Sequence, residues 1–119
     1  MSVTLRRERD DLFRLDVHGA VRRAELERSR DELGVALGPQ GAARLLVVLD
    51  QFTGWAREDD WSGLDFLTPY GDQIVRMAIV GDPTWRDELL LFVAAGLRRA
   101  PVEFFASGAV ESARTWLTA

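Results

Sequence analysis

The sequence predicts a single α/β domain with a mainly parallel sheet, and three observations support this prediction. Segments with the apolar pattern of strands alternate with segments that have the pattern of helices. Two expected strands, residues 44–49 and 74–80, are almost continuous apolar runs, as in parallel strands buried on both faces. The length of 119 residues and the hydrophobic content of 47% suit one core, so residues 1–119 are expected to form one domain.

An antiparallel hairpin is expected at the start of the chain. Its strands are residues 3–9 and 12–19, and the second alternates apolar with polar residues as a half-buried strand does. The two residues between them are both aspartate, which is a turn signal. A helix is expected over residues 21–37, because its apolar residues share one face and Gly38-Pro39 follows it.

The two central strands are separated by the least regular part of the chain. Asp50 is expected to close the first of them. The second, residues 74–80, follows an irregular segment, residues 52–70, whose most helical part is residues 58–67. Parallel strands need a crossover connection, and this segment supplies it.

A helix, a short strand and a final helix are expected in the last third of the chain. Asp82 can cap a helix over residues 84–97, and Pro83 suits its first position. Residues 101–105 are the expected strand, and residues 109–117 the final helix. The order is therefore β-β-α-β-α-β-α-β-α, with helices on both faces of a mainly parallel sheet and an antiparallel N-terminal edge strand.

Three segments carry a likeness to a known family. They are residues 49–55 (LDQFTGW), residues 74–85 (IVRMAIVGDPTW), and residues 102–105 (VEFF) with the tail to Leu117. In order and spacing they resemble the SpoIIAA-like proteins of the STAS superfamily, and the small bacterial, CRAL-TRIO-related group most of all. The resemblance implies a SpoIIAA-like fold and a non-enzymatic ligand-binding or regulatory domain. It also implies an apolar pocket under a mobile helix and an association with membranes.

An anti-sigma-factor antagonist is the alternative function that this resemblance implies. Such relatives are switched by phosphorylation of a serine in an Asp-Ser-Ser-Gly-Leu motif at a helix start. The counterpart in this chain is Asp60-Trp61-Ser62-Gly63-Leu64, where Trp61 replaces the serine that is usually phosphorylated. We therefore expect no phosphorylation switch in this loop, and Ser62 is the candidate interaction surface for the alternative.

The candidate ligand site is an aromatic rim at the carboxyl ends of the parallel strands, where open α/β sheets bind their ligands. Tryptophan offers a large amphipathic surface that can line an apolar pocket, although ordinary core packing would also bury it. We expect an apolar or lipid-like small ligand. The expected wall residues are Phe52, Trp55, Trp61 and Trp85, and the expected polar anchors are Asp50 and Asp82.

The helix over residues 84–97 is too apolar for an ordinary surface helix. Residues 89–97 are nine consecutive nonpolar residues, which leave no polar face over two turns. An exposed apolar surface of this kind is usually buried against a protein partner, a ligand or a membrane. We expect a homodimer through Leu91 and Phe92, while a lid over an apolar ligand and a peripheral membrane contact remain alternatives.

Several kinds of chemistry are excluded or disfavoured by composition. The chain has no cysteine and one histidine, His18, so thiolate catalysis and transition-metal sites are not expected. The acidic cluster of residues 58–60 with Asp65 is expected to be solvated, not metal-binding. A net charge of −4 argues against nucleic acid as a partner. We expect no enzymatic activity and no cofactor. Because no apolar stretch is as long as a membrane span, we expect a cytoplasmic protein.

Overall fold

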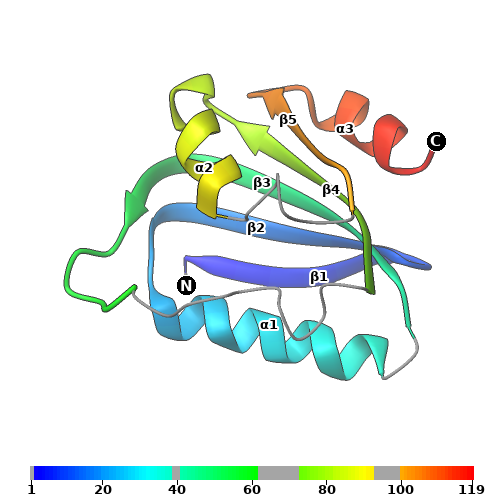
Figure 1. Ribbon diagram of the computed structural model, residues 1–119, viewed down its shortest axis with the longest axis horizontal. Coiled ribbons are helices and arrows are strands. Elements are labelled where there is room, and N and C mark those ends of the chain that lie inside the picture. Colours follow the sequence, from blue (N-terminus) through cyan, green and yellow to red (C-terminus); the bar gives the residue numbers. More distant parts are fainter. Residues whose placement is uncertain (1, 39–40, 62–72, 93–99) are drawn as a thin grey trace.

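A five-stranded mixed sheet forms the centre of the computed structural model, which describes residues 2–38, 41–61, 73–92 and 100–119 (Figure 1). The strands lie in the order β1-β2-β3-β4-β5. β1 and β2 are antiparallel, and each later pair of neighbours is parallel. The predicted architecture, a mainly parallel sheet with an antiparallel N-terminal edge strand, is therefore confirmed.

The N-terminal hairpin and the first helix form where the sequence predicts them. β1 (Val3–Arg9) pairs with β2 (Leu12–Val21), and Asp10 in the turn takes a φ of 44°. α1 (Arg23–Leu37) follows and ends at Gly38, whose φ of 66° suits glycine. The alternation in β2 turns Phe13, Leu15 and Val17 toward α1, while Leu12 packs into the core on the other face.

β3 (Ala43–Trp55) is longer than expected, so the prediction that Asp50 closes this strand is wrong. The pairing with β2 continues to Trp55 through a change of register beyond His18. Two residues in this stretch have positive φ, Gln51 at 51° and Gly54 at 103°. These local irregularities let β3 continue beside β2 while they change which face of the sheet its side chains take.

The irregularities place three large side chains on one face of the sheet. Leu49, Phe52 and Trp55 are three residues apart, and in a regular strand such neighbours would point to opposite faces. All three nevertheless pack into the same core cluster. The two residues with positive φ each lie between two of them, so this local geometry brings the aromatic residues to the α1 side of the sheet.

The second half of the chain agrees with the prediction at its strands and at one helix start. β4 (Ile74–Gly81) leads to Asp82, whose carboxylate accepts a 3.0 Å hydrogen bond from the backbone N–H of Thr84. A single 3₁₀ turn (Pro83–Trp85) precedes α2 (Arg86–Phe92), and the rest of the helix expected to residue 97 lies outside the described residues.

The helix expected over residues 58–67 does not begin where the sequence predicts it. Residues 57–59 form a turn, and residues 62–72 lie outside the described part of the chain. Asp59 bonds to the start of α1, which holds the segment in this turn. β5 (Val102–Ala106) and α3 (Val110–Leu117) complete the order.

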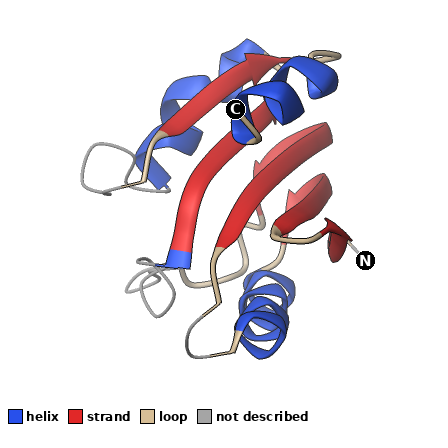
Figure 2. Cartoon of the chain, turned by 90° about the vertical axis from the view of Figure 1, so that its right-hand side faces the viewer, coloured by secondary structure: helices blue, strands red, loops and turns tan. Residues whose placement is uncertain are grey.

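Two apolar cores lie on the two faces of the sheet. α1 and α2 cover one face, where Leu26, Leu33 and Leu89 meet the strands. α3 covers the other, where Ala113 and Leu117 meet β3 and β4 (Figure 2). The predicted cover on both faces is confirmed. Among the described residues, no helix has the length and apolar character that crossing a membrane requires.

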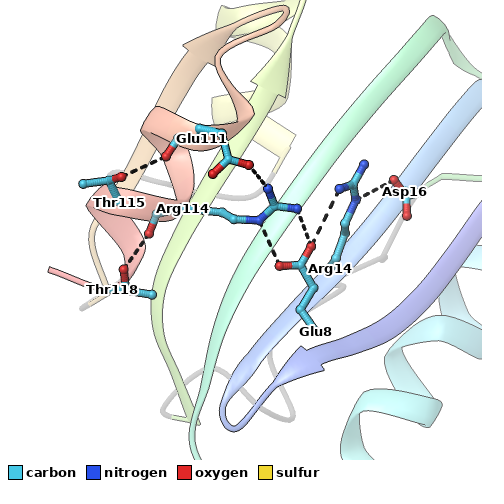
Figure 3. Close-up of polar contacts among 7 residues, drawn as sticks. All are labelled: Glu8, Arg14, Asp16, Glu111, Arg114, Thr115 and Thr118. Carbon is cyan, nitrogen blue, oxygen red and sulfur yellow. Dashed lines mark hydrogen bonds and ion pairs between the residues drawn. The ribbon is translucent and has the colours of Figure 1, made fainter.

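A network of ion pairs ties α3 to the N-terminal hairpin (Figure 3). Arg114 donates two hydrogen bonds to the Glu8 carboxylate, from Nε at 3.0 Å and from Nη2 at 2.7 Å. Arg14 lies 3.7 Å from the same carboxylate and bonds to Asp16 at 2.9 Å. The hydrogen bond from Arg114 lowers the pKa of Glu8 below its ordinary value of 4.5, although burial opposes the shift.

Glu8→Gln is expected to destabilise the protein near neutral pH by about 1–2 kcal/mol, because it removes a charge-assisted pair. The folded-state pKa of Glu8 is depressed, so its contribution is full above 4.5 and is lost as the pH falls through the lower folded value. Urea unfolding of the wild type and of Glu8→Gln, at pH values from 7 to 3, measures the difference between their free energies of unfolding. A stability difference that stays constant over that range would contradict the assignment.

Candidate functional site

Five aromatic side chains meet at the carboxyl end of β3, beside α2. We call Phe52, Trp55, Trp61, Trp85 and Phe92 the aromatic cluster. Phe52 lies between two of its members, with ring centroids 4.8 Å from Trp85 and 5.4 Å from Trp55. Phe92 joins the other side, 5.1 Å from Trp55 and 6.2 Å from Trp61. The four expected wall residues are thus brought together, and Phe92 of α2 is added to them.

The position of Trp61 is fixed by the turn that carries it. Its indole Nε1–H donates a 2.8 Å hydrogen bond to the carbonyl oxygen of Ala56. The turn itself is tied to the start of α1, because Asp59 accepts bonds from the backbone N–H of Arg23 at 2.9 Å and from the Arg22 guanidinium at 3.1 Å. These bonds lower the pKa of Asp59, although desolvation acts against them. Of the acidic residues expected to be solvated, Glu58 and Asp60 are exposed, Asp59 instead holds the turn that carries Trp61, and Asp65 lies outside the described residues.

A partly open apolar cavity of about 50 Å³ lies next to the cluster, between the sheet and the helices α1 and α2. Its described lining contains only apolar side chains. A space of this size could hold more than one water molecule, but an apolar lining keeps such cavities dry. The described residues that line it are Leu15, Val17, Val21, Leu26, Leu45, Val47, Leu49, Phe52, Trp55, Met77, Ile79, Leu89 and Phe92.

A second, open groove of about 490 Å³ lies outside the cavity. Its described lining residues are Trp55, Trp61, Glu88, Leu91 and Phe92. Trp55 and Phe92 line both spaces, so their rings form the wall between the cavity and the groove. The volume of the groove falls in the range of small-molecule sites, about 300–1,000 Å³.

The two expected polar anchors are not part of this arrangement. Asp50 is exposed, and its carboxylate lies 3.2 Å from Nδ1 of His18, its register partner on β2. Asp82 caps the 3₁₀ turn before α2, where its carboxylate accepts hydrogen bonds from both the N–H and the hydroxyl of Thr84. The first of these bonds lowers the pKa of Asp82. Neither aspartate is among the described residues that line the cavity or the groove.

Sequence reasoning missed Glu88, the one titratable group among the described lining residues of the groove. Its position at the start of α2 makes it look like an ordinary helix-start acid. Its place directly before the apolar stretch is the one signal that could have identified it. Ser62, the candidate interaction surface of the alternative function, lies outside the described residues.

Comparisons with known proteins agree on one kind of fold. A family model described as SpoIIAA-like matches residues 12–118 of the chain. The crystal structure of an uncharacterized protein from Shewanella loihica PV-4, from the DUF3478 family and with a SpoIIAA-like fold, is similar with a TM-score of 0.73. The two chains are 20% identical, and the match covers 97% of this chain and 91% of that one. No curated protein matches the chain.

Proposed function

The chain belongs to the SpoIIAA-like family, and from this premise we propose that it is a non-enzymatic module that binds an apolar or lipid-like small molecule. The observation that carries the proposal is the wall of Trp55 and Phe92 between an apolar cavity and an aromatic groove. Such a pair of spaces suits a molecule with an apolar end for the cavity and a second part for the groove.

The size of the cavity decides how it could be used. At about 50 Å³ it is smaller than the engineered apolar cavities of about 150 Å³ that bind benzene. A ligand must therefore displace the Trp55 or Phe92 ring and join the two spaces. Both rings are partly exposed, so their movement leaves the central core in place.

The non-enzymatic part of the proposal rests on the lack of acid–base groups in this region. Among the described lining residues, Glu88 is the single titratable side chain, and it lies on the groove and not in the cavity. The histidine pairs with Asp50 on two exposed side chains. General acid–base catalysis needs a side chain positioned within hydrogen-bond reach of the proton that it transfers.

A titration with straight-chain alcohols tests the proposal. With 1-hexanol, 1-octanol and 1-decanol we expect tryptophan fluorescence to change, and affinity to rise by about fourfold for each added methylene group. The rise should stop at a chain length set by the combined spaces. Fluorescence that does not change with any of the three alcohols would show the proposal to be wrong.

We also propose that the protein forms a homodimer through α2. The observation is Leu91, which is 82% exposed within the apolar stretch of residues 89–97. Pairing of two copies about a twofold axis would bury this side chain on both.

Sedimentation equilibrium is expected to give a mass near twice 13.4 kDa, and Leu91→Glu should reduce it to that of the monomer. Val35→Glu is the matched control, because Val35 is 86% exposed but belongs to α1 and not to α2. This control should leave the dimer intact. A monomeric wild-type protein would rule the dimer out.

A further inference from the structure

The groove combines aromatic rings with a single negative charge. Three of its five described lining residues are aromatic, the fourth is Leu91, and the fifth is Glu88. We propose that this groove binds an organic cation, a quaternary or methylated ammonium group whose alkyl chain enters the cavity. The inference rests on the proposed function and adds the ligand class that the groove selects.

The aromatic rings that line the groove are not stacked on one another. The planes of Trp61 and Phe92 are inclined by 76°, and those of Trp55 and Phe92 by 49°, so the rings meet at angles and are not stacked face to face. An aromatic face carries negative quadrupole charge, and a cation within about 6 Å of the ring centroid is attracted to it. Tryptophan gives the strongest attraction, and two of the three rings are tryptophan.

The same groove is poorly suited to an anion. A carboxylate or phosphate needs hydrogen-bond donors or positive charge, and no basic side chain is among the described lining residues. The N–H of Trp61 already donates to Ala56. Arg22 pairs with Asp59 and Arg86 with Asp87, and the exposed Arg57 is not among the described lining residues. Glu88 would also repel an anion.

A methylated ammonium fits better than a primary one. A primary ammonium has three N–H donors that must each find an acceptor. The described lining of the groove supplies one carboxylate, on Glu88, and otherwise apolar side chains. A quaternary ammonium makes no such demand, and its methyl groups pack against aromatic rings.

Three probes with the same chain length test the inference: octyltrimethylammonium, 1-octanol and octanoate, each below its micelle-forming concentration. Isothermal calorimetry is expected to show octyltrimethylammonium binding about tenfold more tightly than 1-octanol, and octanoate more weakly than either. Glu88→Gln should reduce the advantage of the cation over 1-octanol by about threefold. Asp87→Asn is the matched control, because Asp87 is the neighbouring acid on α2 and does not line the groove.

The outcomes separate this inference from the proposed function. If the three probes bind equally, the cation site is wrong while the apolar site stands. If none binds, the proposed function fails as well. If Asp87→Asn reduces the advantage as much as Glu88→Gln does, general surface charge is responsible and the inference is overturned. If probes bind only to the Leu91→Glu monomer, a second copy occupies the groove in the native protein, which overturns it too.

Discussion

Trp55→Ala is expected to weaken the binding of 1-octanol by about 50- to 100-fold. Trp55 lines both the cavity and the groove, so its removal takes ring surface away from both ends of a bound ligand. A tryptophan buries about 150–250 Å² in all, and loss of about 100 Å² of that contact at about 25 cal/mol per Å² costs about 2.5 kcal/mol, which is a factor in this range. The measurement is calorimetric titration, since the variant also loses part of the fluorescence signal.

Trp116→Ala is the matched control for this experiment. Trp116 is also a partly buried tryptophan, but it lies on the α3 side of the sheet, against Phe105 and under the Arg76 guanidinium. Both substitutions should lower stability, because each removes a large ring from a core. Only Trp55→Ala should lower affinity. Equal losses of affinity in the two variants would mean that binding follows stability and that the aromatic cluster is not the site.

Gly54→Ala is expected to destabilise the protein by about 2–3 kcal/mol. The φ of Gly54 is +103°, which L-residues rarely adopt and which adds about 1–3 kcal/mol of strain for any other residue. A Cβ at this position would also lie 3.2 Å from the Trp85 ring, closer than normal packing allows. Urea denaturation with an unchanged slope would report the loss directly.

Gly108→Ala separates the two contributions. Gly108 has a φ of +87° but no atom within 4 Å of the position of an added Cβ. It should therefore show the backbone strain alone and lose about 1 kcal/mol less than Gly54→Ala. If Gly54→Ala and Gly108→Ala lower the free energy of unfolding by the same amount, the contact with Trp85 does not restrict the residue at position 54. In that case the aromatic cluster is looser than its ring distances indicate.

The fold could be predicted from the sequence because its strands and helix starts have strong local signals. The continuous apolar runs of β3 and β4 and the Asp82-Pro83 pair before α2 are such signals, and the structure agrees with them. The end of β3 could not be predicted. Gln51 and Gly54 leave regular strand geometry, and only the pairing with β2 explains why the strand nevertheless continues.

The candidate site was predictable in its aromatic part and not in its polar part. Phe52 and Trp55 lie at the carboxyl end of β3, and the rule for parallel sheets points to that end. The same rule does not say which face of the sheet a side chain takes. Asp50 is one residue from Leu49, so alternation turns it away from the cavity toward the α3 side. Glu88 belongs to the groove through the packing of α2, which the sequence does not encode locally.

The link between Glu8 and Arg114 joins residues 106 positions apart. During synthesis, the hairpin leaves the ribosome long before α3 exists to cover the opposite face of the sheet. Until then the apolar side chains that α3 will bury, among them Leu46, Ala78 and Val80, have no cover. A chain whose other elements fold before α3 docks passes through a stage with an open apolar face on the sheet, the kind of surface that chaperones hold. Arrival of Arg114 at Glu8 marks the end of that stage.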